Sequence, residues 1–271
     1  MTDAERRAAL EEIAGEVRVC TRCRLHETRT NAVPGEGDAS TEVVFVGEGP
    51  GMNEDREGRP FVGRAGGLLV NLLGHIGWSR EDVFITNIVK CRPPGNRDPE
   101  PDEIAACAPY LERQLATLDP SVVVTLGRHS MGRFMPGTRI SQAHGTTRVA
   151  DPATGARDAT VFAMYHPAAA LRTPAIERES YEDVALIPTV LTDARARRAE
   201  ARRAARAGQA APIASASVAA GAGTPDADPF PGDASPQADP TATGPIRPAA
   251  QPHTAAPLPD TEPAADQLSL F

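Results

Sequence analysis

Residues 42–51 read EVVFVGEGPG, a nearly continuous apolar run that leads directly into a loop with three glycines. Short runs that are apolar at almost every position are typical of parallel strands covered on both faces. Three further runs of this kind follow, at Val83–Val89, Ser121–Leu126 and Thr160–Tyr165. Together with Glu42–Val46 they predict a central, mainly parallel sheet of four strands.

Helices are expected between these strands and on both sides of them. The spacing of apolar residues predicts helices over residues 4–18, Arg64–Ile76, Asp102–Leu118, Arg128–Phe134 and Ile176–Ala205. Pro188 is expected to break or kink the last of these helices. Alternating strands and helices form right-handed βαβ units, so we predict an α/β fold, a three-layer α/β/α sandwich. Ligands of such sheets bind beyond the carboxyl ends of the strands.

The composition of the chain changes near its end. Twelve of the 26 prolines follow Arg195, and the last part of the chain is rich in alanine and proline with few aromatic residues. Such a segment cannot bury enough apolar surface to offset the entropy of the chain. We therefore predict one globular domain over residues 1–200 and a disordered tail over residues 201–271.

Charge and hydropathy limit the classes of function. The net charge of −8 disfavours nucleic-acid binding on average, but the local field at a groove decides the affinity for DNA. No apolar run reaches the length of a membrane span, and residues 1–7 lack the apolar core of a signal peptide. We expect a cytoplasmic protein with no membrane partner.

The chain has four cysteines, which in a cytoplasmic protein more often bind metal than form disulfides. Cys20 and Cys23 form a C-x2-C pair, which places two thiolates on one metal centre. Cys91 and Cys107 must come from separate elements, and His26 is near enough to Cys23 to replace one thiolate. The spacing favours a site with four thiolates, and it leaves a zinc ion and a [4Fe–4S] cluster both open.

The loops after the strands carry the candidate site residues. The glycines of Gly47–Gly51 let the backbone approach a ligand, but this loop lacks the lysine and the spacing of nucleotide-binding loops. Phe61, between two glycines, is either a core residue or a stacking platform for a base. Asn87 lies within an otherwise apolar run and needs hydrogen-bond partners, so its amide either ties down backbone or reads a base edge. His166 follows the last strand, at the same rim as Glu48 and Asn87.

Taken together, these motifs resemble the family 4 uracil-DNA glycosylases, the iron–sulfur type of bacteria and archaea. The resemblance spans roughly residues 17–195 and combines several ordered motifs with matching cysteines. It rests on Cys20-x2-Cys23, Gly47–Gly51, Glu54-Asp55, Gly58–Gly63, Thr86–Pro94, Cys107 and His166-Pro167. The resemblance implies a uracil-DNA glycosylase fold, a [4Fe–4S] cluster on the four cysteines, and uracil-containing DNA, single- or double-stranded, as the substrate. For such an enzyme we expect a monomer that associates with the nucleoid.

The resemblance also assigns roles to single residues. Phe61 would stack on the extruded uracil, and Asn87 would form hydrogen bonds with its polar edge. His166 would contact the uracil carbonyl oxygen on which negative charge develops. Leu171 and Arg172 would lie near the DNA at the site of base flipping. The expected reaction is hydrolysis of the glycosidic bond of deoxyuridine in DNA, as in base excision repair.

The carboxylate that orients the attacking water stays open between Glu48 and Glu54. We favour Glu48 because it lies almost at the end of the first strand, where Gly49 and Gly51 would line the pocket. A related subgroup traps uracil-DNA covalently through a histidine on a loop after the second strand. The corresponding segment here, Arg92–Glu100, contains no histidine, which favours turnover.

The last five residues, QLSLF, form an apolar cluster that differs from the tail before it. The cluster resembles the short peptide with which bacterial repair and replication proteins bind the DNA sliding clamp. An extended peptide of this kind can fill an apolar pocket while a disordered linker provides reach. We expect clamp binding through Gln267, Leu268, Leu270 and Phe271, with an incidental apolar terminus as the alternative.

Two other functions compete with the enzyme. One is a non-catalytic or covalently uracil-trapping iron–sulfur (or zinc) protein that binds DNA without releasing free base. The other is an α/β nucleotide-binding protein that uses the Gly47–Gly51 turn, against which the missing phosphate-binding lysine argues. Release of uracil from an oligonucleotide separates the enzyme from both.

Overall fold

The computed structural model describes the backbone of residues 1–209 and the side chains of residues 1–207. Its sheet has six strands in the order β1-β3-β2-β4-β6-β5. The four predicted strands form its centre and run parallel to one another, and a short antiparallel strand lies at each edge. The strands are β1 Glu36–Gly37, β2 Val43–Gly47, β3 Phe84–Asn87, β4 Val122–Leu126, β5 Thr147–Val149 and β6 Thr160–Met164.

The predicted α/β/α fold is confirmed, and each predicted helix is present. These helices are α1 Asp3–Val19, α3 Arg64–His75, α4 Pro101–Leu118, α5 Arg128–Phe134 and α8 Pro174–Gln209. Three short helices were not predicted, namely α2 Met52–Glu57, α6 Ile140–Ala143 and α7 Pro167–Ala170. Short 3₁₀ turns cover Arg24–Glu27, Arg80–Asp82, Pro94–Asn96 and Pro152–Thr154.

Helix α8 runs without interruption through Pro188, so the break is wrong, and the alternative of a kink stays a prediction. Val184 and Ile187 before the proline, and Leu191 after it, are buried in the same apolar layer. Packing on both sides of Pro188 keeps the helix continuous although one backbone hydrogen bond is lost. The helix also extends past residue 200, where we predicted the domain to end. The predicted tail beyond residue 209 and the clamp peptide lie outside the described residues.

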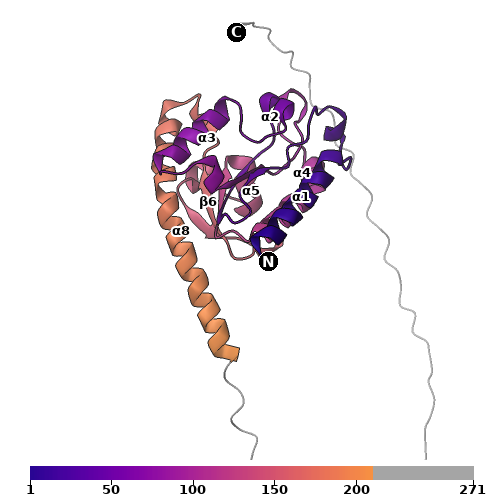
Figure 1. Ribbon diagram of the computed structural model, residues 1–271. Helices are drawn as coiled ribbons and strands as arrows, with labels where there is room; N and C mark the ends of the chain where they lie inside the picture. Colours follow the sequence, from indigo (N-terminus) through magenta and orange to yellow (C-terminus); the bar gives the residue numbers. More distant parts are fainter. Residues whose placement is uncertain (210–271) are drawn as a thin grey trace, which may run out of the picture. The chain divides into compact units, whose positions relative to one another are not determined.

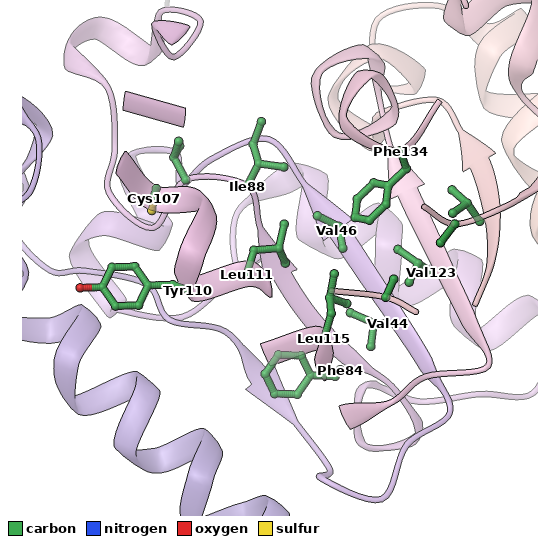
Figure 2. Packing of buried hydrophobic residues seen from close by; sticks show 14 of the residues in the cluster. Val44, Val46, Phe84, Ile88, Cys107, Tyr110, Leu111, Leu115, Val123 and Phe134 are labelled. Carbon is green, nitrogen blue, oxygen red and sulfur yellow. The ribbon is translucent and has the colours of Figure 1, made fainter. Parts of the chain in front are cut away.

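Two apolar layers hold the sandwich together. Val43 and Phe45 of β2 face the layer that contains residues of α3 and α8, whereas Val44 and Val46 face the layer that contains residues of α1 and α4. This alternation follows from the two-residue repeat of a strand. Figure 1 shows α3 and α8 on one side of the sheet and α1 and α4 on the other. Figure 2 shows the second layer, where Val44, Val46 and Val123 lie near Leu111 and Leu115 of α4.

The register of the sheet determines where the strand-end loops meet. Gly47, the last residue of β2, is paired with Asn87, the last residue of β3. On the other side of β2, the chain leaves β4 at Gly127 and leaves β6 at Tyr165. The carboxyl ends of the four parallel strands therefore share one rim. Within residues 1–209, none of the helices has the length and apolar composition that a membrane span requires.

Candidate active site and cysteine pocket

A cavity of about 560 Å³ lies at this rim of the sheet. It brings together nearly all of the side chains and glycines that the sequence singled out for the site. Its lining includes Glu48, Gly49, Gly51, Glu54, Phe61, Asn87, His166 and Arg172. Leu171, which is not among the lining residues, lies next to Arg172 at the end of α7 and is 38% exposed.

Asn87 is almost completely buried at the end of β3. Among the described residues, no group forms a hydrogen bond with its Oδ1 atom. The neighbouring strand approaches Asn87 at Gly47, where a Cβ atom would lie 2.4 Å from this oxygen and 2.6 Å from Cζ of Phe61. A buried amide oxygen without a partner is costly, so its position in the cavity indicates a ligand that donates a hydrogen bond.

Phe61 has a backbone conformation that a phenylalanine rarely adopts. Its φ angle is 52°, in the left-handed region, and its side chain is 6% exposed. The ring lies with its centroid 5.7 Å from that of His166, and the two planes are tilted by 30°. Strained backbone of this kind persists only where surrounding contacts enforce it, and such residues cluster at functional sites.

His166 is held in one orientation at the start of α7. Its Nδ1 atom accepts a hydrogen bond from the backbone N–H of Ala168 at 3.1 Å, so the proton of the neutral ring is on Nε2. Burial lowers the pKa of His166 to about 4. At neutral pH the residue is therefore an uncharged imidazole whose Nε2–H group is free to donate.

The two candidate carboxylates have different environments. Oε1 of Glu54 accepts hydrogen bonds from the backbone N–H groups of Val62 and Gly63, both at 3.0 Å, and its Oε2 accepts one from Gly51 at 3.1 Å. Glu54 thus joins the loop after β2 to the loop that carries Phe61. The side chain of Glu48 is 30% exposed and accepts no hydrogen bond from any described residue.

Glu48 has two ionisable neighbours that the sequence analysis missed. Nε2 of His129 lies 3.8 Å from Oε2 of Glu48 and 3.3 Å from a carboxylate oxygen of Asp98. Burial raises the pKa of Glu48, and the proximity of His129 opposes this shift. His129 follows β4 by three residues, so the rule that sites lie after the strands would have found it.

The four cysteines line one pocket between the end of α1, the loop after β3 and α4. Arg29 donates to Sγ of Cys91 at 3.0 Å, and the backbone N–H of Lys90 donates to Sγ of Cys107 at 3.2 Å. In the part of the chain that the structure describes, no three cysteine sulfurs lie within 4.8 Å of one another. His26 lines the same pocket, but its Nδ1 atom is 2.8 Å from the carbonyl oxygen of Cys23.

Burial raises the pKa of the Cys107 thiol to about 11, and it also raises the pKa values of Cys91 and Cys23. Thiols with raised pKa values ionise readily only when a bound metal provides positive charge. The backbone N–H of Arg22 also donates to Sγ of Cys20 at 3.5 Å, so three of the sulfurs accept hydrogen bonds from N–H groups, which suits thiolates. The four side chains and their surroundings therefore fit a metal centre with four thiolates.

Known proteins of one family match most of the described residues. A sequence model of the uracil DNA glycosylase superfamily matches residues 34–187. The type-4 uracil-DNA glycosylase of Saccharolobus solfataricus is 49% identical over 189 residues, which cover 68% of this chain and 87% of the relative. The chain belongs to the type-4 uracil-DNA glycosylases. The type-4 enzymes of Sulfurisphaera tokodaii (50% identity, 65% of this chain, 81% of the relative) and Archaeoglobus fulgidus (47%, 64%, 88%) are similarly close.

Membership of the type-4 uracil-DNA glycosylases confirms the resemblance inferred from the motifs. The matched region includes Glu48, Phe61, Asn87 and His166, whereas Cys20 and Cys23 precede it. The type-4 relative of Saccharolobus solfataricus aligns over 189 residues, a longer stretch than the superfamily match.

Proposed function

We propose that this type-4 uracil-DNA glycosylase hydrolyses the N-glycosidic bond of deoxyuridine in DNA, releasing uracil and leaving an abasic site. One observation carries the proposal. The Oδ1 atom of Asn87 is buried at the cavity without a partner among the described residues, within the same lining as Phe61 and a neutral His166. The cavity thus offers an unused acceptor, a stacking surface and a donor, which are the groups that a flipped uracil needs.

Uracil must first leave the duplex, at a cost of about a few kcal/mol in lost stacking and pairing. The ring of Phe61 provides a stacking surface in the cavity that offsets part of this cost. Oδ1 of Asn87 then accepts from N3–H of uracil, and the amide nitrogen donates to O4. Cytosine presents an acceptor at N3 and a donor at C4, so the same amide orientation rejects it.

Cleavage of the glycosidic bond leaves negative charge on uracil and an oxocarbenium-like sugar. Nε2–H of His166 is the donor that we assign to the carbonyl oxygen on which this charge develops. The pKa of about 4 keeps the ring neutral. The hydrogen bond that Nδ1 of His166 accepts from Ala168 fixes the orientation of the ring before the substrate binds. A preorganised donor of this kind lowers a barrier by about 3–4 kcal/mol.

We assign the orientation of the attacking water to Glu48. Its carboxylate lines the cavity and has unused acceptor capacity, whereas three backbone N–H groups occupy the carboxylate of Glu54. Glu54 instead shapes the pocket. Glu48→Gln should slow single-turnover cleavage and leave the melting temperature nearly unchanged. Near-normal cleavage by Glu48→Gln, combined with loss of cleavage in Glu54→Gln at full stability, would reverse the assignment.

We propose that Cys20, Cys23, Cys91 and Cys107 hold a [4Fe–4S] cluster. Four sulfurs on one tetrahedral zinc ion lie about 3.8 Å apart, because each Zn–S bond is about 2.3 Å. The four thiolates alone suit either group, and the similarity to the type-4 glycosylases, which the motifs indicate to be the iron–sulfur type, favours the cluster. When bound, the cluster ties the end of α1 to the loop after β3 and to α4. Stoichiometric iron and sulfide with visible absorbance supports this assignment, whereas zinc in a colourless protein contradicts it.

Two further assignments concern the DNA and the clamp. We propose that Leu171 and Arg172, exposed at the end of α7, contact the strand from which uracil is extruded. Residues 267–271 are proposed to bind the sliding clamp, with the linker providing reach. Deletion of these five residues should abolish clamp pull-down and preserve activity on short oligonucleotides. Unchanged pull-down would refute clamp binding.

The experiment that tests the proposed function is cleavage of a uracil-containing oligonucleotide followed by alkali. Strand breaks at uracil together with free uracil support the glycosylase. Binding without release would instead favour a non-catalytic module, and a stable protein–DNA adduct would favour covalent trapping. The segment Arg92–Glu100 contains no histidine, so we expect turnover.

A further inference from the structure

The unusual backbone of Phe61 raises the question of what holds it. A bulky residue at a φ angle of 52° relaxes to negative φ unless its neighbours prevent it. The residue follows Pro60 in the loop between α2 and α3. Gly66 on α3 provides the space for its carbonyl group, because a Cβ atom at this glycine would lie 1.9 Å from the carbonyl oxygen of Phe61.

Arg80 does not line the cavity, but its side chain forms hydrogen bonds with this loop. Its Nη1 atom donates to the carbonyl oxygen of Phe61 at 2.8 Å, and its Nη2 atom donates to that of Pro60 at 2.6 Å. The side chain of Arg80 is only 18% exposed. A guanidinium group presents its donors in a planar fork, so it can bind two consecutive carbonyl oxygens at once.

Glu36 fixes the guanidinium of Arg80 in turn. Its Oε1 atom accepts from Nε of Arg80 at 3.1 Å and from Nη2 at 2.5 Å. Glu36 belongs to the edge strand β1, where it is paired with Ile85 of β3. The short edge strand therefore places a carboxylate that holds Arg80 against the Phe61 loop.

The same loop is held from its other end by Glu54. The carbonyl groups of Pro60 and Phe61 accept from a cation, and the N–H groups of Val62 and Gly63 donate to a carboxylate. Four consecutive residues are thus fixed by two oppositely charged side chains. This arrangement leaves the backbone little freedom to relax, and it explains how the conformation of Phe61 persists.

We infer that Arg80 is a positioning residue for uracil binding, which holds Phe61 in the conformation that presents its ring to the cavity. The inference rests on the proposed role of Phe61 as the stacking platform. Arg80 itself does not reach the substrate. It acts through the carbonyl groups of Pro60 and Phe61, and the ring that they orient lies 5.7 Å from that of His166.

Arg59 provides a matched control. It forms the same kind of two-pronged ion pair with Glu36, at 2.8 Å through Nε and 3.1 Å through Nη2. Arg59 lies in the same loop and its side chain is 58% exposed, but among the described residues its guanidinium forms no hydrogen bond with the carbonyl groups of Pro60 and Phe61. Arg59→Gln therefore removes a cation from Glu36 without releasing the carbonyl groups of Pro60 and Phe61.

The test compares Arg80→Gln, Arg80→Lys and Arg59→Gln in the full chain, with metal content verified. For each variant, inhibition by free uracil and the single-turnover rate across enzyme concentrations are measured. Arg80→Gln should raise the inhibition constant of uracil and the half-saturating enzyme concentration about tenfold or more, because two charge-assisted hydrogen bonds are lost. The maximal rate should change less. Arg59→Gln should stay within about twofold, as expected for an exposed ion pair.

Arg80→Lys should give an intermediate loss, since an ammonium group keeps the pair with Glu36 but lacks the fork. A double-mutant cycle with Phe61→Ala tests whether Arg80 affects uracil binding through the ring of Phe61. Once the ring is removed, Arg80→Gln should weaken uracil binding little further. Full additivity with Phe61→Ala, or equal behaviour of Arg80→Gln and Arg59→Gln, would overturn the inference.

Hydrogen exchange of the amides of Val62 and Gly63 gives a readout that does not depend on activity. Exchange should be faster in Arg80→Gln than in Arg59→Gln, and equal exchange would overturn the role of Arg80. If Arg80→Gln does not fold, Arg80→Lys gives the same comparison. If the unmodified protein releases no uracil, the proposed function fails, and exchange still decides whether Arg80 holds the loop.

Discussion

Replacement of His166 by alanine tests the proposed chemistry at one atom. The substitution removes the Nε2–H group that we assign to the charge developing on uracil. It also removes the Nδ1 acceptor of the Ala168 N–H group at the start of α7. His166→Asn separates these effects, because an asparagine side chain can still accept the Ala168 N–H bond at a helix N-cap but does not reach as far into the cavity.

The magnitude follows from the state of the ring. With a pKa of about 4, His166 is neutral at pH 7, so the variant loses one preorganised neutral donor rather than a charge. Loss of such a donor lowers the rate of the chemical step about 10²- to 10³-fold. Loss of the cap alone costs about 1 kcal/mol of stability. We therefore expect both variants to be 10²- to 10³-fold slower, with a larger drop in melting temperature for alanine.

The assay is single-turnover cleavage of a uracil-containing oligonucleotide at saturating enzyme, which isolates the chemical step from product release. His75, the last residue of α3, does not line the cavity, so His75→Ala is the control for loss of an imidazole elsewhere in the domain. A rate within tenfold of the unmodified protein for both His166 variants would refute the assigned role. So would an inflection in the rate near pH 6.5 that disappears in His166→Asn, because it would show a ring that titrates normally.

Three further predictions concern other parts of the site. Gly47→Ala should abolish uracil binding while the chain remains folded, because the new Cβ atom would clash with the side chains of both Asn87 and Phe61. Inhibition by free uracil measures this loss, and unchanged inhibition would contradict it. Activity should fall as pH falls through the pKa of Glu48, which burial raises above its usual range, and Glu48→Gln should lack this acidic limb of the rate profile. Cys107→Ser should lower bound iron and visible absorbance, and full retention of both would exclude Cys107 as a ligand.

His166 also predicts a dependence of stability on pH. Its folded-state pKa of about 4 lies below its ordinary value of about 6.5, so between these values the unfolded chain binds the extra proton. The stability that comes from keeping this ring neutral is complete above pH 6.5 and falls as the pH is lowered, and the loss reaches about 3 kcal/mol near pH 4. The difference in unfolding free energy between the unmodified protein and His166→Asn should therefore shrink on acidification. A pH-independent difference contradicts the lowered pKa.

Much of the fold could be predicted because the central strands are buried on both faces. Such strands are apolar at nearly every position, and β2, β3, β4 and β6 were found on this basis. The edge strands β1 and β5 have two and three residues, too few to show a repeat. The break expected at Pro188 was wrong because local propensity was overridden by packing on both sides of the proline.

The site was predictable in part for a related reason. Loops after parallel strands meet at one rim, so Glu48, Asn87 and His166 could be grouped before the structure was known. The sequence could not separate Glu48 from Glu54, because the hydrogen bonds that engage the Glu54 carboxylate come from backbone N–H groups eight and nine residues further along the chain. The contact of Arg80 with Glu36 spans 44 residues, and no local pattern in the sequence indicates it.

We propose that the cavity at the strand ends encloses uracil and that uracil is cleaved from DNA there. The decisive experiment is quantitation of free uracil released from a uracil-containing oligonucleotide, with substrate in excess over the full chain. We expect several equivalents of uracil per protein, matched by an equal number of alkali-labile sites, and no release of cytosine from a matched oligonucleotide. Tight binding without free uracil, or a protein–DNA adduct that stops after one equivalent, would contradict it.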